Sequence, residues 1–195
     1  MPREYRSPVI FCGENPVLTL HRPGGDDAVA AASFWHCTYS AQGEGDLLVI
    51  WVDDGAVALT AIYSDNAALA RFLTDTLNQH FGDFRGRGFG AMAVTPARFS
   101  QQSDSRVYHR VACHAADRII ELEWRDVRDR QLMVATESMV GDKSFDIASV
   151  LCPVGQATIT VDGARVQGEV RLGQDDAGRP RSSAFLAFAE SWVAR

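Results

Sequence analysis

The stretch LLVIWVDDGAVALTAIY, residues 47–63, decides the fold class of this chain. Its first six residues are all apolar, which is typical of a strand buried on both faces. Asp53-Asp54-Gly55 follow as a turn signal, and Asp-Gly predicts a type I′ turn because both central residues of that turn need positive φ. The apolar residues at 57, 59, 61 and 63 then alternate along a returning strand. The stretch therefore predicts a β-hairpin.

Similar short apolar or alternating runs lie on both sides of this hairpin, with turn residues at intervals of about 8–12 residues. We expect strands near 8–12, 16–21 and 29–39 before it, and near 107–114, 120–124, 131–139 and 145–151 after it, the last ended by Pro153. A second hairpin is expected at 158–170 around Asp162-Gly163, and 174–181 is expected to be a surface loop. The terminal segment 182–193 has two interpretations. It is either a helix with one apolar stripe or a strand on which Leu186, Phe188 and Trp192 share one face. We favour a closing strand, because an open sheet edge needs cover.

One segment has the periodicity of a helix, residues 65–81. Its apolar positions include Leu69, Phe72, Leu73 and Leu77, which form a single stripe with a period of 3.6 residues. Ser64 or Asp65 can cap the first free backbone N–H groups, and Gly82 can end the helix in a left-handed conformation. A helix with one apolar stripe must cover an open barrel end or one face of a sheet.

These patterns predict one all-β, mainly antiparallel domain over residues 1–195, either a lipocalin-like barrel or a two-sheet sandwich, with one central amphipathic helix near 65–81. A chain of 195 residues with 46% hydrophobic and 23% charged residues is large enough to bury a core as a single domain. Alternating strands do not separate a barrel from a sandwich, because both have one buried and one outer face.

Composition and charge exclude several classes of function. The net charge of −6 lacks the basic footprint of a nucleic-acid binder, so we expect no nucleic-acid partner. No run approaches the roughly 20 apolar residues of a membrane-spanning helix, so we expect no membrane insertion. The segment 8–12 is too short for the apolar core of a signal peptide, which predicts a cytoplasmic location. Nearly all basic residues are arginine, with Lys143 the single lysine, which is typical of GC-rich bacterial genomes.

The four cysteines, at 12, 37, 113 and 152, are far apart in or beside apolar runs and form no CxxC pair. We expect buried free thiols rather than disulfides or a metal site, and no cofactor is predicted. His36-Cys37 and Cys113-His114 are adjacent pairs, and neighbours on a strand point to opposite faces. Each pair therefore offers at most one group to any one site.

Two other polar groupings have ordinary explanations. Glu121 and Glu123 share one strand face opposite an apolar face, so a solvated outer surface is expected rather than an acid–base pair. Arg85-Gly86-Arg87-Gly88-Phe89-Gly90 contains glycines and two arginines that fit an anion. It follows a helix and precedes a strand, however, which reverses the order of known phosphate loops, so a connection is expected.

His109 lies on the apolar face of its predicted strand. An imidazole there is either a hydrogen-bonded core residue or a polar anchor in a barrel lumen, where few polar groups orient a ligand. Aromatic residues are frequent in the first half of the chain and make an apolar pocket plausible. The candidate ligand-binding residues are Trp35, Tyr39, Tyr63, His109 and Trp124.

The hairpin from Thr158 to Gly168, with Val161-Asp162-Gly163 at its turn, is similar to a hairpin of the lipocalin-like carotenoid hydratases. The similarity covers about a dozen residues. In that family acidic residues and histidine follow near a tryptophan, whereas Arg171-Leu172-Gly173 follows here, so no catalytic residue is carried over. The resemblance implies a lipocalin-like (calycin) barrel.

Three functions are compatible with these observations. The first is binding of a small, mainly apolar molecule in a barrel pocket, which requires a cavity of at least about 300 Å³. The second is an enzyme acting on a lipid-like substrate in the same barrel, with His109 or a carboxylate as the acid–base group. The third is a homo-oligomeric interaction protein, such as a homodimer, without a ligand.

Overall fold

The computed structural model describes residues 7–104 and 106–195 of the chain, and its secondary structure is mostly strand. The strands are β1 (Val9–Glu14), β2 (Val17–His21), β3 (Ala28–Tyr39), β4 (Gly45–Asp53), β5 (Ala58–Ser64), β6 (Val94–Asp104), β7 (Tyr108–Ala115), β8 (Ile119–Val127), β9 (Gln131–Val140), β10 (Lys143–Val161), β11 (Ala164–Arg165), β12 (Leu172–Gln174), β13 (Pro180–Ser182) and β14 (Ala184–Ala194). The helices are α1 (Ala67–Thr76) and two 3₁₀ helices, η1 (Asn78–His80) and η2 (Phe89–Ala91). The expected all-β class with one α-helix is confirmed.

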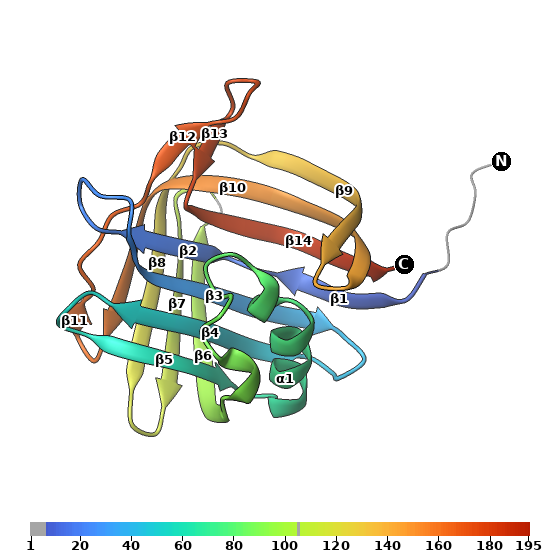
Figure 1. Cartoon of the computed structure of the whole chain (residues 1–195), viewed down its shortest axis with the longest axis horizontal. Helices are drawn as coiled ribbons and strands as arrows, with labels where there is room; N and C mark the ends of the chain where they lie inside the picture. Colours follow the sequence, from blue (N-terminus) through green and yellow to red (C-terminus); the bar gives the residue numbers. More distant parts are fainter. Residues whose placement is uncertain (1–6, 105) are drawn as a thin grey trace.

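Nine strands close into a ring, which makes the domain a barrel (Figure 1). Their order is β14-β2-β3-β4-β5-β6-β7-β8-β10, and the ring closes where β10 pairs with β14. Neighbours are antiparallel except for β5 and β6, which run parallel. The parallel pair is possible because α1 and the 3₁₀ helices form the long connection between those two strands.

The position between β14 and β3 in the barrel wall is shared by β1 and β2, which follow one another along it. β2 lies between β14 and β3 through Val17 and Leu18, and β1 lies between the same two strands further along, through Cys12 and Gly13. Pro16 separates them, and proline cannot donate a backbone hydrogen bond inside a sheet. The break places Asn15, which is buried, between the two strands.

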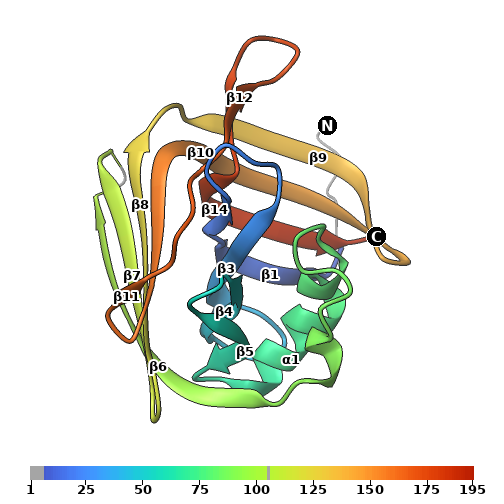
Figure 2. The same cartoon turned by 60° about the vertical axis from the view of Figure 1, so that its left-hand side comes forward.

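The 19-residue strand β10 corrects the expectation that Pro153 ends a strand. Along one edge β10 pairs with β9 from Lys143 to Leu151 and then with β8 from Val154 to Val161. Pro153 lies at the exchange of partners, where a missing N–H removes no bond from either ladder. The first half of β10 therefore extends beyond the barrel together with β9, β14 and β1 (Figure 2).

The domain has two buried apolar clusters, one inside the ring and one outside it. Side chains from all nine ring strands form the inner cluster, with Phe34, Trp124 and Ile159 among the largest. The outer cluster joins the opposite faces of β3 and β4, through Trp35 and Trp51, to α1. Helix α1 thus covers the outer wall of the barrel rather than an open end (Figure 2).

The α-helix is shorter than the sequence pattern predicts, because the last part of the predicted segment forms a 3₁₀ helix instead. Asn66, rather than Ser64 or Asp65, is the N-cap, and its side chain accepts a hydrogen bond from the N–H of Leu69 at 3.1 Å. The α-helical part stops at Leu77, and η1 follows. Gly82 therefore does not end it, and the segment 81–84 is left to cross the outer wall of the barrel.

The two Asp-Gly turns have different geometries. Asp162 and Gly163 have φ of 50° and 81°, the two positive values that a type I′ turn requires. At Asp54-Gly55 only the glycine has positive φ, so the type I′ prediction is wrong there. Asp53 pairs with Ala58, which leaves a longer loop, and the Asp54 carboxylate accepts from the N–H groups of Ala56 and Val57. The expected loop at 174–181 carries the short β12–β13 pair at its base.

The closing strand favoured for the terminal segment is confirmed as β14, with one departure from regular alternation. Ala189 has a φ of +49°, and the pairing with β10 shifts register between Ala148 and Val150. This bulge reverses the faces that follow it. Leu186 and Phe188 pack with the inner cluster, whereas Trp192 packs with the outer one. The expectation that these three side chains share a face is therefore wrong.

Candidate functional site

An apolar groove of about 390 Å³ lies on the outer wall of the barrel, and we call it the wall groove. One side is the segment 81–84, which follows η1. The other side is the outward face of β9, β10 and β14, through Met133, Ile147, Leu151, Phe185 and Trp192. Its size and apolar lining are those of small-molecule sites, which combine mostly hydrophobic walls with a few polar groups.

The polar group at the base of the wall groove is the carboxyl of Glu190, which is only 4% exposed. Trp192 Nε1 donates a hydrogen bond to Glu190 Oε1 at 2.6 Å. The side chains of Asn15 and Ser149 are its other polar neighbours, and both act to lower its pKa. Asn15 is held in turn, because Ser33 Oγ donates to Asn15 Oδ1 at 2.9 Å. All of these partners are uncharged.

Burial changes the acidity of this carboxyl. Removal from water disfavours the charged form and raises the pKa of Glu190 to about 7, although the donor groups of Trp192, Ser149 and Asn15 oppose the rise. Near neutral pH the group therefore exists in both protonation states. A carboxyl with such a pKa in an apolar groove can donate a hydrogen bond, exchange a proton or balance a positive charge.

The bulge at Ala189 is what brings Glu190 to the groove. Regular alternation after Leu186 and Phe188 would point residue 190 into the barrel interior. The extra residue instead turns Glu190 and Trp192 outward. Bulges of this kind change the direction of side chains at functional sites. A positive φ is unfavourable for alanine, so the strand pairing around Ala189 must stabilise this conformation.

Asp83 is the second acid of the wall groove and lies at its exposed rim. Thr19 Oγ1 donates to Asp83 Oδ2 at 2.5 Å, and Trp51 Nε1 donates to the backbone oxygen of Asp83 at 2.7 Å. Arg87 lies over the Trp51 ring, 3.2 Å from the ring centroid, and donates to the same backbone oxygen. These contacts tie the segment 81–84 to the barrel wall and fix one side of the groove.

Three of the five predicted ligand-binding residues, Tyr63, His109 and Trp124, are buried inside the ring. His109 and Trp124 are in ring contact at 5.6 Å between centroids, and Phe188 contacts His109 at 6.0 Å. Trp124 Nε1 donates to the backbone oxygen of Val17 at 3.0 Å, which ties β8 to the start of β2. These three residues belong to the packed core of the barrel.

The other two, Trp35 and Tyr39, lie on β3 away from the barrel interior. Trp35 is buried under the helix and stacks on Phe81, at 6.5 Å between centroids. Since Phe81 lines the wall groove, Trp35 supports that groove from behind. Tyr39 is 55% exposed at the end of the strand. The structure therefore does not bring the five residues to one cavity.

His109 is the most unusual of these core residues. Neither ring nitrogen has a hydrogen-bond partner within the described part of the chain, and the residue is 1% exposed. Burial, with a smaller contribution from His36, lowers its pKa to about 4. His109 is therefore neutral at physiological pH and packs as an aromatic ring.

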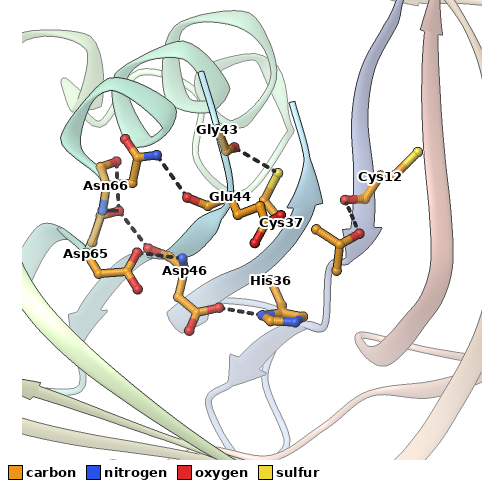
Figure 3. Close-up of polar contacts among 10 residues, drawn as sticks. Cys12, His36, Cys37, Gly43, Glu44, Asp46, Asp65 and Asn66 are labelled. Atoms are coloured by element: carbon orange, nitrogen blue, oxygen red, sulfur yellow. Dashed lines mark hydrogen bonds and ion pairs between the residues drawn. The ribbon is translucent and has the colours of Figure 1, made fainter. Parts of the chain in front are cut away.

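A polar cluster joins the ends of β3 and β4 to the start of α1 (Figure 3). His36 Nδ1 and Asp46 Oδ1 are 2.7 Å apart, and Asp65 Oδ1 accepts from the N–H of Asp46 at 2.8 Å. Asn66 Nδ2 donates to the backbone oxygen of Glu44 at 2.9 Å. Burial raises the pKa of Asp46, and the hydrogen bond with His36 opposes the rise. The cluster anchors the helix start to the barrel.

The Cys-His pairs do not combine into a site. Cys37 donates to the backbone oxygen of Gly43 (Figure 3). It packs in the outer cluster, whereas Cys113 packs in the inner cluster. Burial raises the pKa of Cys113 to about 12, so it is an unreactive thiol. In residues 7–104 and 106–195, no group of three or more His, Cys, Asp or Glu could hold a metal ion.

The remaining polar groupings serve the surface. Glu123 pairs with Arg125 at 2.7 Å, and Glu121 pairs with Arg110, both on the outer face of β8. The glycine- and arginine-rich segment 85–90 is a connection of turns that leads into η2.

Glu190 is the residue that sequence reasoning missed. Its signal is a single charged residue within the mostly apolar run AFLAFAESWV, residues 184–193. A lone carboxylate among buried strand residues is uncommon unless it is paired or functional.

No family model matches the chain, and neither a curated protein nor a solved structure is significantly similar to it. Among its described residues, no helix has the length and apolar character needed to cross a membrane.

Proposed function

We propose that the protein binds a small, mainly apolar molecule in the wall groove. The observation that carries this proposal is an apolar groove of about 390 Å³ with one buried, hydrogen-bonded carboxyl at its base. Binding sites combine a large apolar surface with a few polar groups in the same way. The barrel acts as the rigid scaffold that holds the groove.

The proposal moves the ligand from the barrel interior to its outer wall. Side chains from all nine ring strands pack together inside the barrel, around Trp124 and Phe34. The groove outside is bounded by the segment 81–84, which joins η1 to the barrel wall through contacts of Asp83. A surface segment over a rigid wall can accommodate a ligand without repacking the core.

Binding can be measured with N-phenyl-1-naphthylamine, an uncharged apolar dye whose fluorescence increases in an apolar site. We expect saturable binding with a Kd of about 1–10 μM, the range of modest apolar contacts. Gly82→Trp should weaken binding roughly 10-fold, because the new side chain starts at the groove lining. Gly82 has ordinary φ and no heavy atom within 4 Å of an added Cβ, so this variant is expected to fold.

Gly173→Trp is the matched control for this experiment. Gly173 also has ordinary φ and open space around an added Cβ, but it lies in β12 and does not line the groove. The dye should bind this variant as it binds the wild-type protein. Absence of saturable binding to the wild-type protein, or equal affinity for both tryptophan variants, would contradict the proposal.

Acid–base chemistry on the bound molecule is the second candidate function, favoured by one observation. The pKa of Glu190 is raised to about 7, and a general acid or base is most effective when its pKa is near the working pH. Glu190 rather than His109 would hold the reacting proton, because His109 is enclosed in the core. The cytoplasmic location and the similarity to lipocalin-like hydratases stay predictions.

A further inference from the structure

The lining of the wall groove is acidic as well as apolar. Glu190 and Asp83 line it, and no lysine, arginine or histidine of the described chain does. Asp83 at the rim has Arg87 nearby, which compensates part of its charge. Glu190 at the base has no such compensation, since its polar neighbours Trp192, Asn15 and Ser149 are all neutral.

A buried carboxylate without a positive partner is costly, because neutral hydrogen bonds replace only part of its hydration. Nothing around it requires an acid, since the outer cluster is apolar and a neutral acceptor would satisfy the hydrogen bond from Trp192. The chain nonetheless uses a bulge at Ala189 to turn Glu190 into the groove. The missing positive charge is therefore expected to come from what the groove binds.

The Glu190 carboxyl has acceptor positions that its neighbours do not occupy. Trp192 Nε1 occupies one side of Oε1, and the Ser33–Asn15 hydrogen bond fixes the Asn15 amide with its oxygen engaged. A carboxylate has about four lone-pair positions, so the described donors leave acceptor capacity toward the groove.

We propose that the wall groove selects an apolar molecule carrying one ammonium group, with the ammonium against Glu190 and the hydrocarbon against Ile147, Leu151 and Phe185. This proposal rests on the proposed function and names the chemical class of its ligand. Charge complementarity supports a lipophilic amine, and it disfavours a fatty acid, whose carboxylate would meet two acids in the same groove.

The test is displacement of N-phenyl-1-naphthylamine by three ligands that share a twelve-carbon chain: dodecylammonium, dodecan-1-ol and dodecanoate. All are used below the concentrations at which they form micelles, at about pH 8, where Glu190 is mostly ionised. We expect dodecylammonium to bind roughly 10-fold more tightly than dodecan-1-ol, and dodecanoate to bind most weakly.

Glu190→Gln removes the charge and keeps the size of the side chain. Dodecylammonium should lose its advantage in this variant, while dodecan-1-ol should bind about as well as before. Asp176→Asn, which removes one negative charge from the exposed β12–β13 turn, is the matched control and should retain the preference for the amine. The comparison of ligands on the wild-type protein needs no variant, so a Glu190→Gln protein that fails to fold does not remove the test.

The outcomes separate the two proposals. Dodecan-1-ol binding as tightly as dodecylammonium to the wild-type protein, or an amine preference that persists in Glu190→Gln, would overturn the choice of an amine and leave the apolar groove standing. Failure of all three ligands and of the dye to bind would overturn the proposed function itself.

Discussion

At the residue scale, the side chains of Glu190 and His109 are both buried, and burial shifts their pKa values in opposite directions. Glu190 is more easily protonated than a free glutamate, and His109 is less easily protonated than a free histidine. Both shifts have the same cause, since a low-dielectric surrounding disfavours whichever form is charged. Glu190 differs in lining a groove, where a ligand can alter its surroundings, whereas His109 is packed between Trp124 and Phe188.

The pKa shift of Glu190 predicts how stability depends on pH. Because its pKa rises from 4.5 when unfolded to about 7 when folded, the folded protein holds a proton that the unfolded chain releases. Its contribution to stability is complete below pH 4.5 and is lost as pH rises through 7, a change of about 3 kcal/mol. Glu190→Gln should not show this loss. Denaturant unfolding at several pH values from 5 to 8 measures the difference between variant and wild type, and parallel curves would contradict it.

The wild-type curve alone does not isolate Glu190. His109 acts in the opposite sense, because its pKa falls from 6.5 to about 4 on folding, so its contribution is present above pH 6.5 and is lost as pH falls through 4. The difference between Glu190→Gln and the wild-type protein cancels the contribution of His109, which both share.

At the element scale, the connection from β5 to β6 determines where the groove forms. Helix α1 packs on the outer wall of β3 and β4, and the segment 81–84 is the part of the connection that faces β9, β10 and β14. Asn66 fixes the start of this connection by capping the helix and by donating to the backbone oxygen of Gln42 and to that of Glu44, the second of which Figure 3 shows. One side chain therefore joins the start of the helix to the loop between β3 and β4.

Asn66→Ala should lower the free energy of unfolding by about 1–2 kcal/mol, because it removes the helix cap and two loop contacts. Asn66→Asp should keep the helix cap, since its carboxylate still accepts from the N–H of Leu69, but it should also be destabilised, because its second oxygen faces the backbone oxygens of Gln42 and Glu44. The midpoints of thermal or urea unfolding measure both effects. An unchanged midpoint for Asn66→Ala would show that tertiary packing alone holds the helix.

At the scale of the whole molecule, ring closure hides most strand edges, and β9 is a notable exception. Within the described residues it pairs with β10 alone, and its side chains Leu132, Val134 and Met139 are 65–73% exposed. An exposed edge strand with apolar side chains favours pairing with another strand. The hypothesis of a homodimer therefore has a defined surface, on which two copies of β9 pair antiparallel across a two-fold axis.

The oligomeric state tests this surface directly. We expect light scattering after size exclusion to show a dimer at about 50 μM and dissociation on roughly 100-fold dilution, as for a modest interface. Leu132→Lys with Val134→Lys should give a monomer, because lysines on an edge strand block pairing. Ile119→Lys, an exposed apolar residue on β8, is the control and should leave the dimer intact. A wild-type protein that is monomeric at all concentrations would exclude the homodimer.

The fold class, most strand positions, the central helix and the hairpin turn at Asp162-Gly163 could be predicted from the sequence. Each depends on local patterns: alternation along a strand, a period of 3.6 residues in a helix, or a dipeptide suited to positive φ. Where a local pattern is compatible with two structures, the sequence does not decide between them. Pro153 can end a strand or lie where two partners exchange, and Asp54-Gly55 can form a two-residue turn or part of a longer loop.

Only the tertiary structure decided that the strands close into a ring, that α1 covers the outer wall, and that Glu190 meets Asn15 and the segment 81–84. Ring closure depends on the pairing of β10 with β14, and that long-range contact has no local signal. The wall groove is assembled from segments as distant as residues 15, 83, 147 and 190, and the bulge at Ala189 reverses the faces that alternation predicts. A sequence pattern specifies which residues are apolar along each element, but packing between elements determines which of them meet and which polar group is left among them.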